Sequence, residues 1–376
     1  METISSSLKT TRVCTLLITY SCNLHCVYCF EKYKSNDPAK RMSLETAKQI
    51  LTKEFADFKR MGNKGRIAID LFGGEPLTYF PIIKDIYAWV TRLESPPPYI
   101  FQVTTNGTLF TDEIKEWFIE RKKDFRVVMS VDGSEAMQMH NRGCSIHDLS
   151  MAFVKETWPN SYFKMTVTSH TLANYADGII CLSENGYKIA STLAEGAKWK
   201  ARDDMIYKEE LEKIARYYME HPDKEPEYPF TFLFKEYLDD RIGELPEKNC
   251  GVGTNVVVYD IDGKAYPCHL FLPIVHGKSI DVDALDFEDS HLVDDDCKDC
   301  KALKICRTCY GYNYKDRGDI SKRDKNMCRL KLVEAKVVSA FQIKYLMNKK
   351  DTLNADELLR LKAAMRCYND LKNFFL

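Results

Sequence analysis

The strongest constraint on the fold is an alternation of apolar runs and helical patterns over the first two hundred residues. Runs rich in β-branched residues, which predict buried strands, recur six times. They lie at 13–19, 66–72, 100–104, 125–131, 162–168 and 188–193. Helical patterns separate them, and the first helix is predicted to begin after Ser43, a suitable N-cap, and to end near Arg60. This alternation predicts parallel strands joined by right-handed helical crossovers.

Polar or glycine residues follow most of these strands. Examples are Gly73-Gly74-Glu75-Pro76, Thr105-Asn106-Gly107 and Asp132-Gly133. Barrels of parallel strands build their sites from the loops at this end of the strands. We therefore predict an α/β fold with a partial (β/α)6 TIM-like barrel, rather than a flat sheet, and a site at the carboxyl ends of its strands.

The first strand leads directly into three cysteines, Cys22, Cys26 and Cys29, with the spacing C-x3-C-x2-C. Three thiolates on one short loop can hold a metal centre. A cubane iron–sulfur cluster needs four ligands, so three protein ligands leave one iron open to a small molecule. The alternatives are a zinc site or a group of reactive thiols. Zinc motifs usually pair two C-x2-C elements, and no fourth ligand lies nearby in the sequence.

The charges of the chain are nearly balanced, with 54 Lys and Arg against 55 Asp and Glu. This balance gives no broad electrostatic attraction to nucleic acid or to an anionic membrane. No run of 18 apolar residues occurs, and the N-terminus lacks the apolar core of a signal peptide. We therefore expect a cytoplasmic protein without nucleic-acid or membrane partners.

A second cysteine group lies between residues 250 and 328. Its members are Cys250, Cys268, Cys297, Cys300, Cys306, Cys309 and Cys328. Asp262-Gly263 predicts a β-hairpin between 254–259 and 264–268, which would bring Cys250 and Cys268 together. Clustered cysteines in a cytosolic protein favour metal over disulfides, with paired zinc ribbons as the alternative to iron–sulfur clusters. The scattered cysteines are interpreted as buried hydrophobes or idle thiols: Cys14, Cys144, Cys181 and Cys367.

The chain is predicted to divide into four segments. Residues 1–12 are a polar arm, and 13–225 form the barrel, which ends at His221-Pro222 before a connector rich in Pro and Glu. Residues 226–330 form a cysteine-rich domain, and 331–376 carry two helical patterns.

Cys22, Cys26 and Cys29, with Tyr28 directly before the last cysteine, resemble the signature loop of the radical S-adenosylmethionine (SAM) enzymes. The resemblance implies a six-unit partial barrel. It also implies that the open iron chelates the amino and carboxylate groups of SAM. The reduced cluster would then cleave the sulfonium to give a 5′-deoxyadenosyl radical, which abstracts a substrate hydrogen. Oxygen-sensitive clusters suggest a reducing, anaerobic cytosol.

The same resemblance implies a set of SAM contacts. Gly74 and Glu75 would contact the amino group, and Arg142 would pair with the carboxylate, as bidentate matching allows. The remaining implied contacts are Asn106, Ser130, Asp132, Thr168 and Leu193, the last two on the adenine side. Each motif also has an ordinary structural interpretation, namely turn formation for Gly-Gly-Glu-Pro, Asn-Gly and Asp-Gly, and a solvated surface position for Arg142.

The second cysteine group resembles the SPASM domain, which holds auxiliary iron–sulfur clusters. The resemblance implies one auxiliary cluster on Cys297, Cys300, Cys306 and Cys328. A second would lie on Cys250, Cys268 and Cys309, with an open or non-cysteine position. The Cys306-x2-Cys309 spacing is one residue shorter than the family usually has. The expected cofactors are therefore three 4Fe–4S clusters and SAM, with a flavodoxin- or ferredoxin-type reductant.

Auxiliary clusters suit reactions that remove a second electron from the substrate. SPASM relatives include maturases of ribosomal peptides and anaerobic sulfatase-maturing enzymes. We expect a peptide-modifying oxidoreductase that forms thioether or carbon–carbon crosslinks. A separate protein would deliver the peptide, or the chain would bind it directly, because residues 1–12 are too short for a recognition domain.

Two alternatives stay open. One is a formylglycine-forming sulfatase maturase. That branch has a proposed catalytic aspartate near the hairpin cysteine, where this chain has His269. His269 could act as a base near neutral pH or could be a plain hairpin side chain. The other alternative is a non-catalytic iron–sulfur electron carrier.

Overall fold

The computed structural model describes residues 11–62, 65–232, 248, 250–303 and 305–371. The chain forms two compact units that interleave along the sequence. The first unit comprises 1–130, 142–162 and 250–287, and the second comprises 131–141, 163–249 and 288–376. Most of the predicted N-terminal arm lies outside the described residues, and Thr11 and Arg12 begin the first strand. The predicted division into four successive segments stays a prediction.

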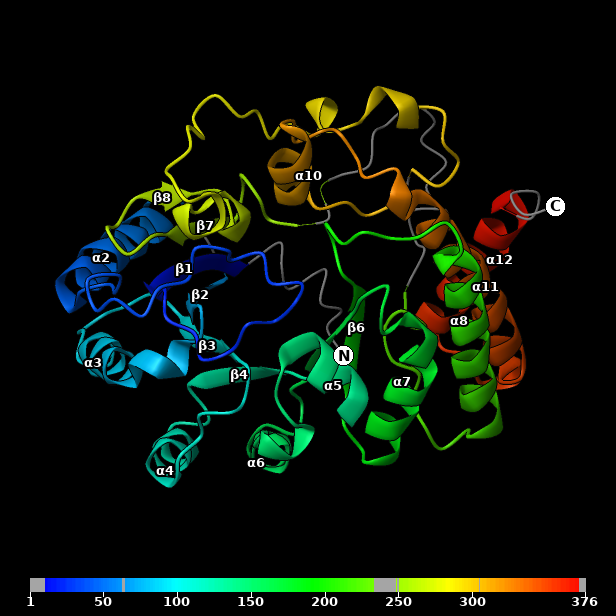
Figure 1. Cartoon of the computed structure of the whole chain (residues 1–376), viewed down its shortest axis with the longest axis horizontal. Helices are drawn as coiled ribbons and strands as arrows, with labels where there is room; N and C mark the ends of the chain where they lie inside the picture. The colour runs from blue at the N-terminus through cyan, green and yellow to red at the C-terminus, as the bar shows by residue number, and fades with distance from the viewer. Residues whose placement is uncertain (1–10, 63–64, 233–247, 249, 304, 372–376) are drawn as a thin grey trace. The chain divides into compact units, whose positions relative to one another are not determined.

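A mostly parallel sheet forms the centre of the first unit (Figure 1). Its order is β4-β3-β2-β1-β7-β8, and only the β7–β8 pair is antiparallel among the pairings described within this unit. The strands are β1 (Thr11–Thr19), β2 (Arg66–Gly73), β3 (Tyr99–Thr105), β4 (Phe125–Ser130), β7 (Val256–Tyr259) and β8 (Ala265–Tyr266). The predicted hairpin is confirmed, with Gly263 at a φ of 85° that favours glycine.

Helices cover one face of this sheet because its side chains are apolar. Phe101 stacks on Phe125 with ring centroids 5.0 Å apart, and Phe118 meets Phe125 edge to face. The predicted cap is confirmed, since Ser43 Oγ accepts a hydrogen bond from Thr46 N at 3.0 Å. The helices of this unit are α2 (Leu44–Arg60), α3 (Phe80–Val90), α4 (Asp112–Glu120), α6 (Met151–Thr157) and α9 (Pro273–His276).

The opposite face of the sheet carries polar side chains in one row. The strand register aligns Thr15, Asp70, Gln102 and Arg126 across β1 to β4. The buried carboxylate of Asp70 accepts hydrogen bonds from Thr15 Oγ1 at 3.0 Å and from Gln102 Nε2 at 3.3 Å. This row satisfies the polar groups that the sheet buries on this face.

The second unit pairs two parallel strands, β5 (Phe163–Val167) and β6 (Ile189–Leu193). Its helices are α5 (Glu135–Arg142, whose last residue belongs to the first unit), α7 (Tyr175–Glu184), α8 (Asp203–Glu220), α10 (Tyr310–Arg317), α11 (Asn326–Met347) and α12 (Ala355–Leu371). Helix α8 packs beside α7 and α11 (Figure 1). The Tyr207 hydroxyl on α8 donates to Glu334 on α11 at 2.6 Å. Gln342 on α11 donates to the carbonyls of Phe230 and Phe232 at 2.9 and 2.6 Å, which holds the connector after α8 against the helix.

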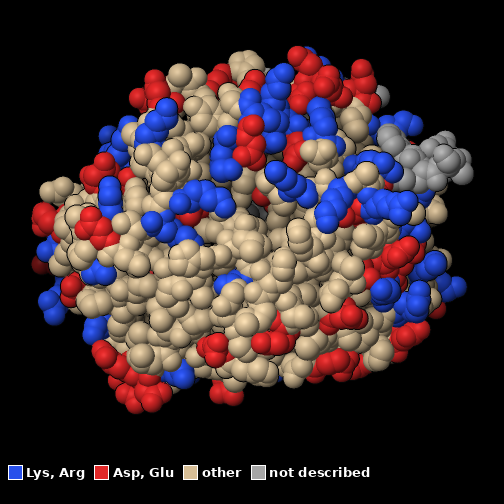
Figure 2. All heavy atoms as spheres, in the orientation of Figure 1, with Lys and Arg blue, Asp and Glu red and all other residues tan. Residues whose placement is uncertain are grey.

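The six predicted strands of the barrel are all present, each within two residues of its predicted ends. Three short helices, α5, α9 and α10, were not predicted, because eight residues or fewer give too little apolar periodicity. Within the described residues, no helix has the length and apolar character needed to cross a membrane. On the face drawn in Figure 2, basic and acidic side chains of the described residues lie mainly in the upper part and along the edges, and uncharged residues fill most of the lower middle.

Candidate functional site

The three-cysteine loop follows β1 in the first unit and is held by its own backbone. Cys29 N donates to the carbonyl of Cys26 at 3.0 Å, and Leu24 N donates to Cys22 Sγ at 3.5 Å. Lys34 Nζ donates to the Leu24 carbonyl at 2.8 Å. Burial raises the pKa of Cys22 to about 11 and also raises that of Cys29. A bound metal would replace these protons, and an N–H aimed at a thiol sulfur suits a thiolate ligand.

The Gly73-Gly74-Glu75 turn lies directly against the start of this loop. Gly74 N donates to the Thr19 carbonyl at 3.0 Å, and Glu75 N donates to the Ser21 carbonyl at 2.8 Å. A Cβ on Gly74 would lie 2.5 Å from Ser21 O and 2.9 Å from Cys22 Cβ. The glycine is therefore required by close backbone approach, and the turn fixes where the cysteine loop leaves β1.

The carboxylate of Glu75 joins the ends of β2 and β3. It is 1% exposed and accepts three hydrogen bonds, from Leu77 N, Thr105 Oγ1 and Asn106 N, at 3.1, 2.8 and 2.7 Å. Burial raises its pKa to about 7, while these hydrogen bonds and the charge of Arg142 oppose the shift. The predicted contact between Glu75 and the amino group of SAM stays a prediction.

Asn106 and Arg142 both approach the cysteine loop. Asn106 Nδ2 donates to Asn23 Oδ1 at 2.9 Å, and Asn106 Oδ1 accepts from Thr108 Oγ1 at 2.7 Å. The guanidinium of Arg142 lies 5.5 Å from the centroid of the Tyr28 ring. Arg142 is 7% exposed, so the solvated-surface interpretation of this residue is wrong. The first unit thus gathers Gly74, Glu75, Asn106 and Arg142 around Cys22, Cys26 and Cys29, and Ser130 ends β4 half-buried.

The other predicted SAM contacts, Asp132, Thr168 and Leu193, belong to the second unit. Asp132 Oδ1 accepts from Thr166 N at 2.9 Å, and Asp132 N donates to Gln138 Oε1 at 2.9 Å. Thr168 Oγ1 donates to Asn141 Oδ1 at 3.1 Å. These bonds order the end of β5, and any contact with SAM stays a prediction. No sequence motif identifies Gln138 and Asn141, because they lie on the unpredicted helix α5.

Four of the second group of cysteines line one cavity in the second unit. They are Cys297, Cys300, Cys306 and Cys328, the set that the family resemblance implies for one auxiliary cluster. The first three lie on a chain of tight turns, with Cys300 N donating to the Cys297 carbonyl at 3.0 Å and Cys306 N to the Ala302 carbonyl at 2.8 Å. Cys328 comes from the first turn of α11. Burial, followed by the nearby charges of Cys306 and Cys297, raises the pKa of Cys328 to about 11.

The donors around this cavity fit an iron–sulfur cluster. Arg323 is 6% exposed and lines the cavity. Its Nη1 donates to the Cys306 carbonyl at 2.7 Å, while its buried Nε has no hydrogen-bond partner among the described residues. Lys325 Nζ donates to Cys297 Sγ at 3.5 Å. An anionic cluster with sulfide acceptors would satisfy such a donor, and four thiols supply the four ligands that a cubane needs.

The remaining members of the second group divide between the units, with Cys250 and Cys268 in the first and Cys309 in the second. A second auxiliary cluster on these three stays a prediction. His269 packs against β2, with its ring centroid 4.3 Å from that of Phe72 and Nε2 3.8 Å from Asp70 Oδ2. It is therefore not a hairpin side chain that projects freely into water. A role as a base stays a prediction.

Comparison with known proteins shows what the chain is similar to. Residues 16–192 match the model of the radical SAM superfamily, so the chain carries a radical SAM domain. A segment of 189 residues is 29% identical to the radical SAM cyclopropyl synthase TigE of Paramaledivibacter caminithermalis and covers 45% of this chain. A segment of 120 residues is 32% identical to the uncharacterized protein MJ0907 of Methanocaldococcus jannaschii and covers 32% of this chain. The matched segments span only 38% of the length of each of these two relatives.

Solved structures show the same fold. The enzyme anSMEcpe with bound AdoMet superposes with a TM-score of 0.63 at 19% identity, covering 94% of this chain and 98% of that one. Streptococcus suis SuiB bound to the precursor peptide SuiA gives a TM-score of 0.57 at 17% identity, covering 84% and 75%. The predicted α/β fold of a radical SAM enzyme with a cysteine-rich, SPASM-like C-terminal region is confirmed.

Replacement of Gly74 by Ala should displace the cysteine loop. The new Cβ would meet backbone atoms that cannot rotate away, and overpacking of this kind costs about 1–3 kcal/mol. We expect a lower melting temperature and a loss of iron bound by Cys22, Cys26 and Cys29 after anaerobic reconstitution. Gly62→Ala is the control, because its φ of 64° strains any side chain but nothing lies within 4 Å of the new Cβ. Equal iron loss in both variants would contradict the proposed packing.

Glu75→Gln should destabilise the fold although it preserves shape. The amide has one acceptor oxygen for three donors, so at least one buried donor loses its partner, at a cost of about 1–3 kcal/mol. Urea unfolding of the apoprotein measures the change. Glu113→Gln, at a carboxylate that is 74% exposed and bound only to Lys84 in the described contacts, should change stability far less. Equal stability of the Glu75→Gln variant and the wild type would show that the three hydrogen bonds contribute little.

Proposed function

We propose that this chain is a radical SAM enzyme that modifies a ribosomally made peptide by oxidative formation of a thioether or carbon–carbon crosslink. The observation that carries the proposal is the cavity lined by Cys297, Cys300, Cys306 and Cys328 in a chain that also has a radical SAM domain. Such a chain has a place for a second redox centre in addition to the three-cysteine loop.

The residues of the first unit would hold the cofactor. Cys22, Cys26 and Cys29 would bind a 4Fe–4S cluster, which with SAM supplies a radical able to abstract hydrogen. Arg142 would bind the carboxylate of SAM, because a buried guanidinium near the cysteine loop matches a carboxylate. Glu75 carries its three hydrogen bonds within the protein, so it would act mainly by positioning the backbone of Gly74 and Asn106 beside the cofactor.

A second redox centre fits the stoichiometry of crosslinking. Joining two side chains removes two hydrogens from the peptide. One leaves as a hydrogen atom to the deoxyadenosyl group, and the other leaves as a proton and an electron. That electron needs an acceptor, and an auxiliary cluster on the four cysteines would provide one. A second auxiliary cluster on Cys250, Cys268 and Cys309 is part of the same proposal.

The relatives support a peptide substrate. TigE is named a cyclopropyl synthase, SuiB is solved with a precursor peptide, and anSMEcpe is solved with bound peptides. We further propose a flavodoxin- or ferredoxin-type reductant, a cytoplasmic location, and delivery of the peptide by a separate recognition protein or by direct binding.

The second candidate is a formylglycine-forming sulfatase maturase. The structure of anSMEcpe, an anaerobic sulfatase maturase, has a similar fold over nearly the whole chain, and this similarity favours the second candidate. His269, next to Asp70, would then take the place of that branch's proposed catalytic aspartate as the base. A non-catalytic electron carrier is less well supported, because it gives no reason for a radical SAM domain.

A triple variant, Cys22→Ala, Cys26→Ala and Cys29→Ala, should separate the two kinds of cluster. We expect it to lose one cluster's worth of iron and sulfide and to produce no 5′-deoxyadenosine, while the auxiliary clusters remain. Cys181→Ala is the control, since Cys181 is exposed and lies outside both cysteine groups. If the triple variant kept its full iron content, the assignment of the loop would be wrong.

Reaction with candidate peptides tests the chemistry itself. The reconstituted enzyme, dithionite and SAM are incubated with short peptides encoded by neighbouring open reading frames or with a sulfatase-derived peptide. A loss of two hydrogens without any new aldehyde supports a crosslink, whereas labelling of the product by a hydrazide supports formylglycine. Absence of 5′-deoxyadenosine with every substrate would overturn the enzyme proposal and favour the electron carrier.

A further inference from the structure

The cavity of the four cysteines is bordered by cationic side chains that the sequence did not single out, and three of them come from one segment of the chain. Arg323 and Lys331 line the cavity, and Lys325 reaches one of its cysteines. All three belong to the second unit, on or just before α11. Each of the three side chains makes a different contact with the cysteines or with the groups beside them.

Lys325 is a cation in direct contact with a cysteine sulfur. Its Nζ lies 3.5 Å from Cys297 Sγ in hydrogen-bond geometry. The same ammonium group forms ion pairs with Asp294 at 3.0 Å and with Asp296 at 3.5 Å. The side chain is 46% exposed, so water screens part of its charge.

Arg323 is anchored both to the cysteine turns and to Asp294. Its Nη1 donates to the Cys306 carbonyl, and its backbone N donates to Asp294 Oδ2 at 3.0 Å. The buried Nε keeps one N–H donor without an acceptor among the described residues. Leaving such a donor unsatisfied is costly, so a further acceptor, beyond the described residues, is expected in the cavity.

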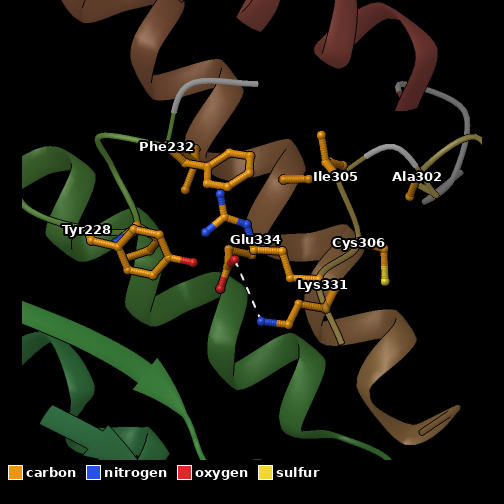
Figure 3. A pocket seen from close by; sticks show the side chains of 11 residues that line it. Tyr228, Phe232, Ala302, Ile305, Cys306, Lys331 and Glu334 are labelled. Carbon is orange, nitrogen blue, oxygen red and sulfur yellow. Dashed lines mark ion pairs between the residues drawn. The ribbon is translucent and has the colours of Figure 1, made fainter. Parts of the chain in front are cut away.

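Lys331 separates the cysteine cavity from a neighbouring one. It lines both, as does Cys306. Figure 3 shows the neighbouring cavity, with Lys331 and Glu334 projecting from α11 and pairing at 4.0 Å, and with Tyr228 facing them. Lys331 is 19% exposed. Glu334 lies within ion-pair distance of its ammonium group, and Lys331 thus holds a cation at the cavity that Cys306 also lines.

Carboxylates hold these cations in place. Asp294 and Asp296 bind Lys325, and Glu334 binds Lys331 while accepting the Tyr207 hydroxyl. Glu195, half-buried after β6, and Asp324 also line the cysteine cavity. A cluster on the four cysteines would therefore meet N–H donors and positive charge from Arg323 and Lys325.

We propose that Arg323, Lys325 and Lys331 raise the reduction potential of the auxiliary cluster on Cys297, Cys300, Cys306 and Cys328, so that it accepts an electron more readily. The inference rests on the proposed function, because it requires a cluster at these cysteines. The physical reason is that reduction adds a negative charge to the cluster. Cations and N–H groups near the sulfur atoms stabilise that charge, and hydrogen bonds to sulfur and local charge are general determinants of cluster potentials.

The test is an EPR-monitored redox titration of the anaerobically reconstituted full-length protein. A Cys22, Cys26 and Cys29 triple-Ala background removes the signal of the first cluster. In this background, Lys331→Met should lower the midpoint potential. A tenfold fall in the equilibrium constant for one-electron reduction corresponds to about 59 mV. Lys325→Met should shift it in the same direction by less, because Lys325 is more exposed.

Lys298→Met is the matched control. Lys298 follows Cys297 directly, is 61% exposed and binds Asp295, so its removal should leave the potential unchanged. Equal potentials in all loaded variants, or an equal shift in Lys298→Met, would overturn the inference. If the Lys331→Met variant fails to bind the cluster, the midpoint potential of the Lys325→Met variant alone tests the inference.

Iron and sulfide counts distinguish a failure of the inference about the reduction potential from a failure of the proposed function. A wild-type protein that binds no cluster, or zinc, at the four cysteines would refute the auxiliary site itself. A loaded cluster with an unmoved potential would refute only the tuning by Arg323, Lys325 and Lys331.

Discussion

The approach of the Gly73-Gly74-Glu75 turn to the start of the cysteine loop is the contact on which the first unit depends. Two backbone hydrogen bonds join the turn to Thr19 and Ser21, and the absence of a side chain on Gly74 lets them form. Glu75 then joins this junction to the end of β3. A loop of three cysteines has little structure of its own, so two strand ends must fix its position before it can hold a metal centre.

In the second unit, charged side chains fix the positions of the groups around four cysteines. Four thiols on short turns and one helix end line a cavity, and Arg323, Lys325 and Lys331 beside it are each held by carboxylates or a carbonyl. Ion pairs of this kind contribute little to stability at a surface. Their value here is positional, because they keep donors aimed at the cysteines, and the same donors favour a negatively charged cluster over an empty cavity.

Much of the site was predictable because its signals are local. The cysteine spacings, the glycine turn, the cap at Ser43 and the hairpin at Asp262-Gly263 each depend on residues close together in the sequence. The short helix α5 and the roles of Gln138 and Asn141 were not predictable. Asn141 bonds to Thr166 and Thr168 at the end of β5, more than twenty residues further along the chain, and Gln138 accepts from Asp132 N. Amide side chains carry no motif that would have indicated these bonds.

The sequence by itself determined the alternating strands and helices, and with them the α/β class, because apolar periodicity and β-branched runs act over a few residues. Through the family resemblance it also predicted that Cys297, Cys300, Cys306 and Cys328 lie together, as they do around one cavity. Only the tertiary structure decided what surrounds them. The Glu75 carboxylate accepts hydrogen bonds from three groups within the protein. Arg142 is buried beside Tyr28, and Arg323 has a buried N–H at the cysteine cavity. Those facts follow from which groups the fold shields from water, and burial is a property of the packed chain as a whole.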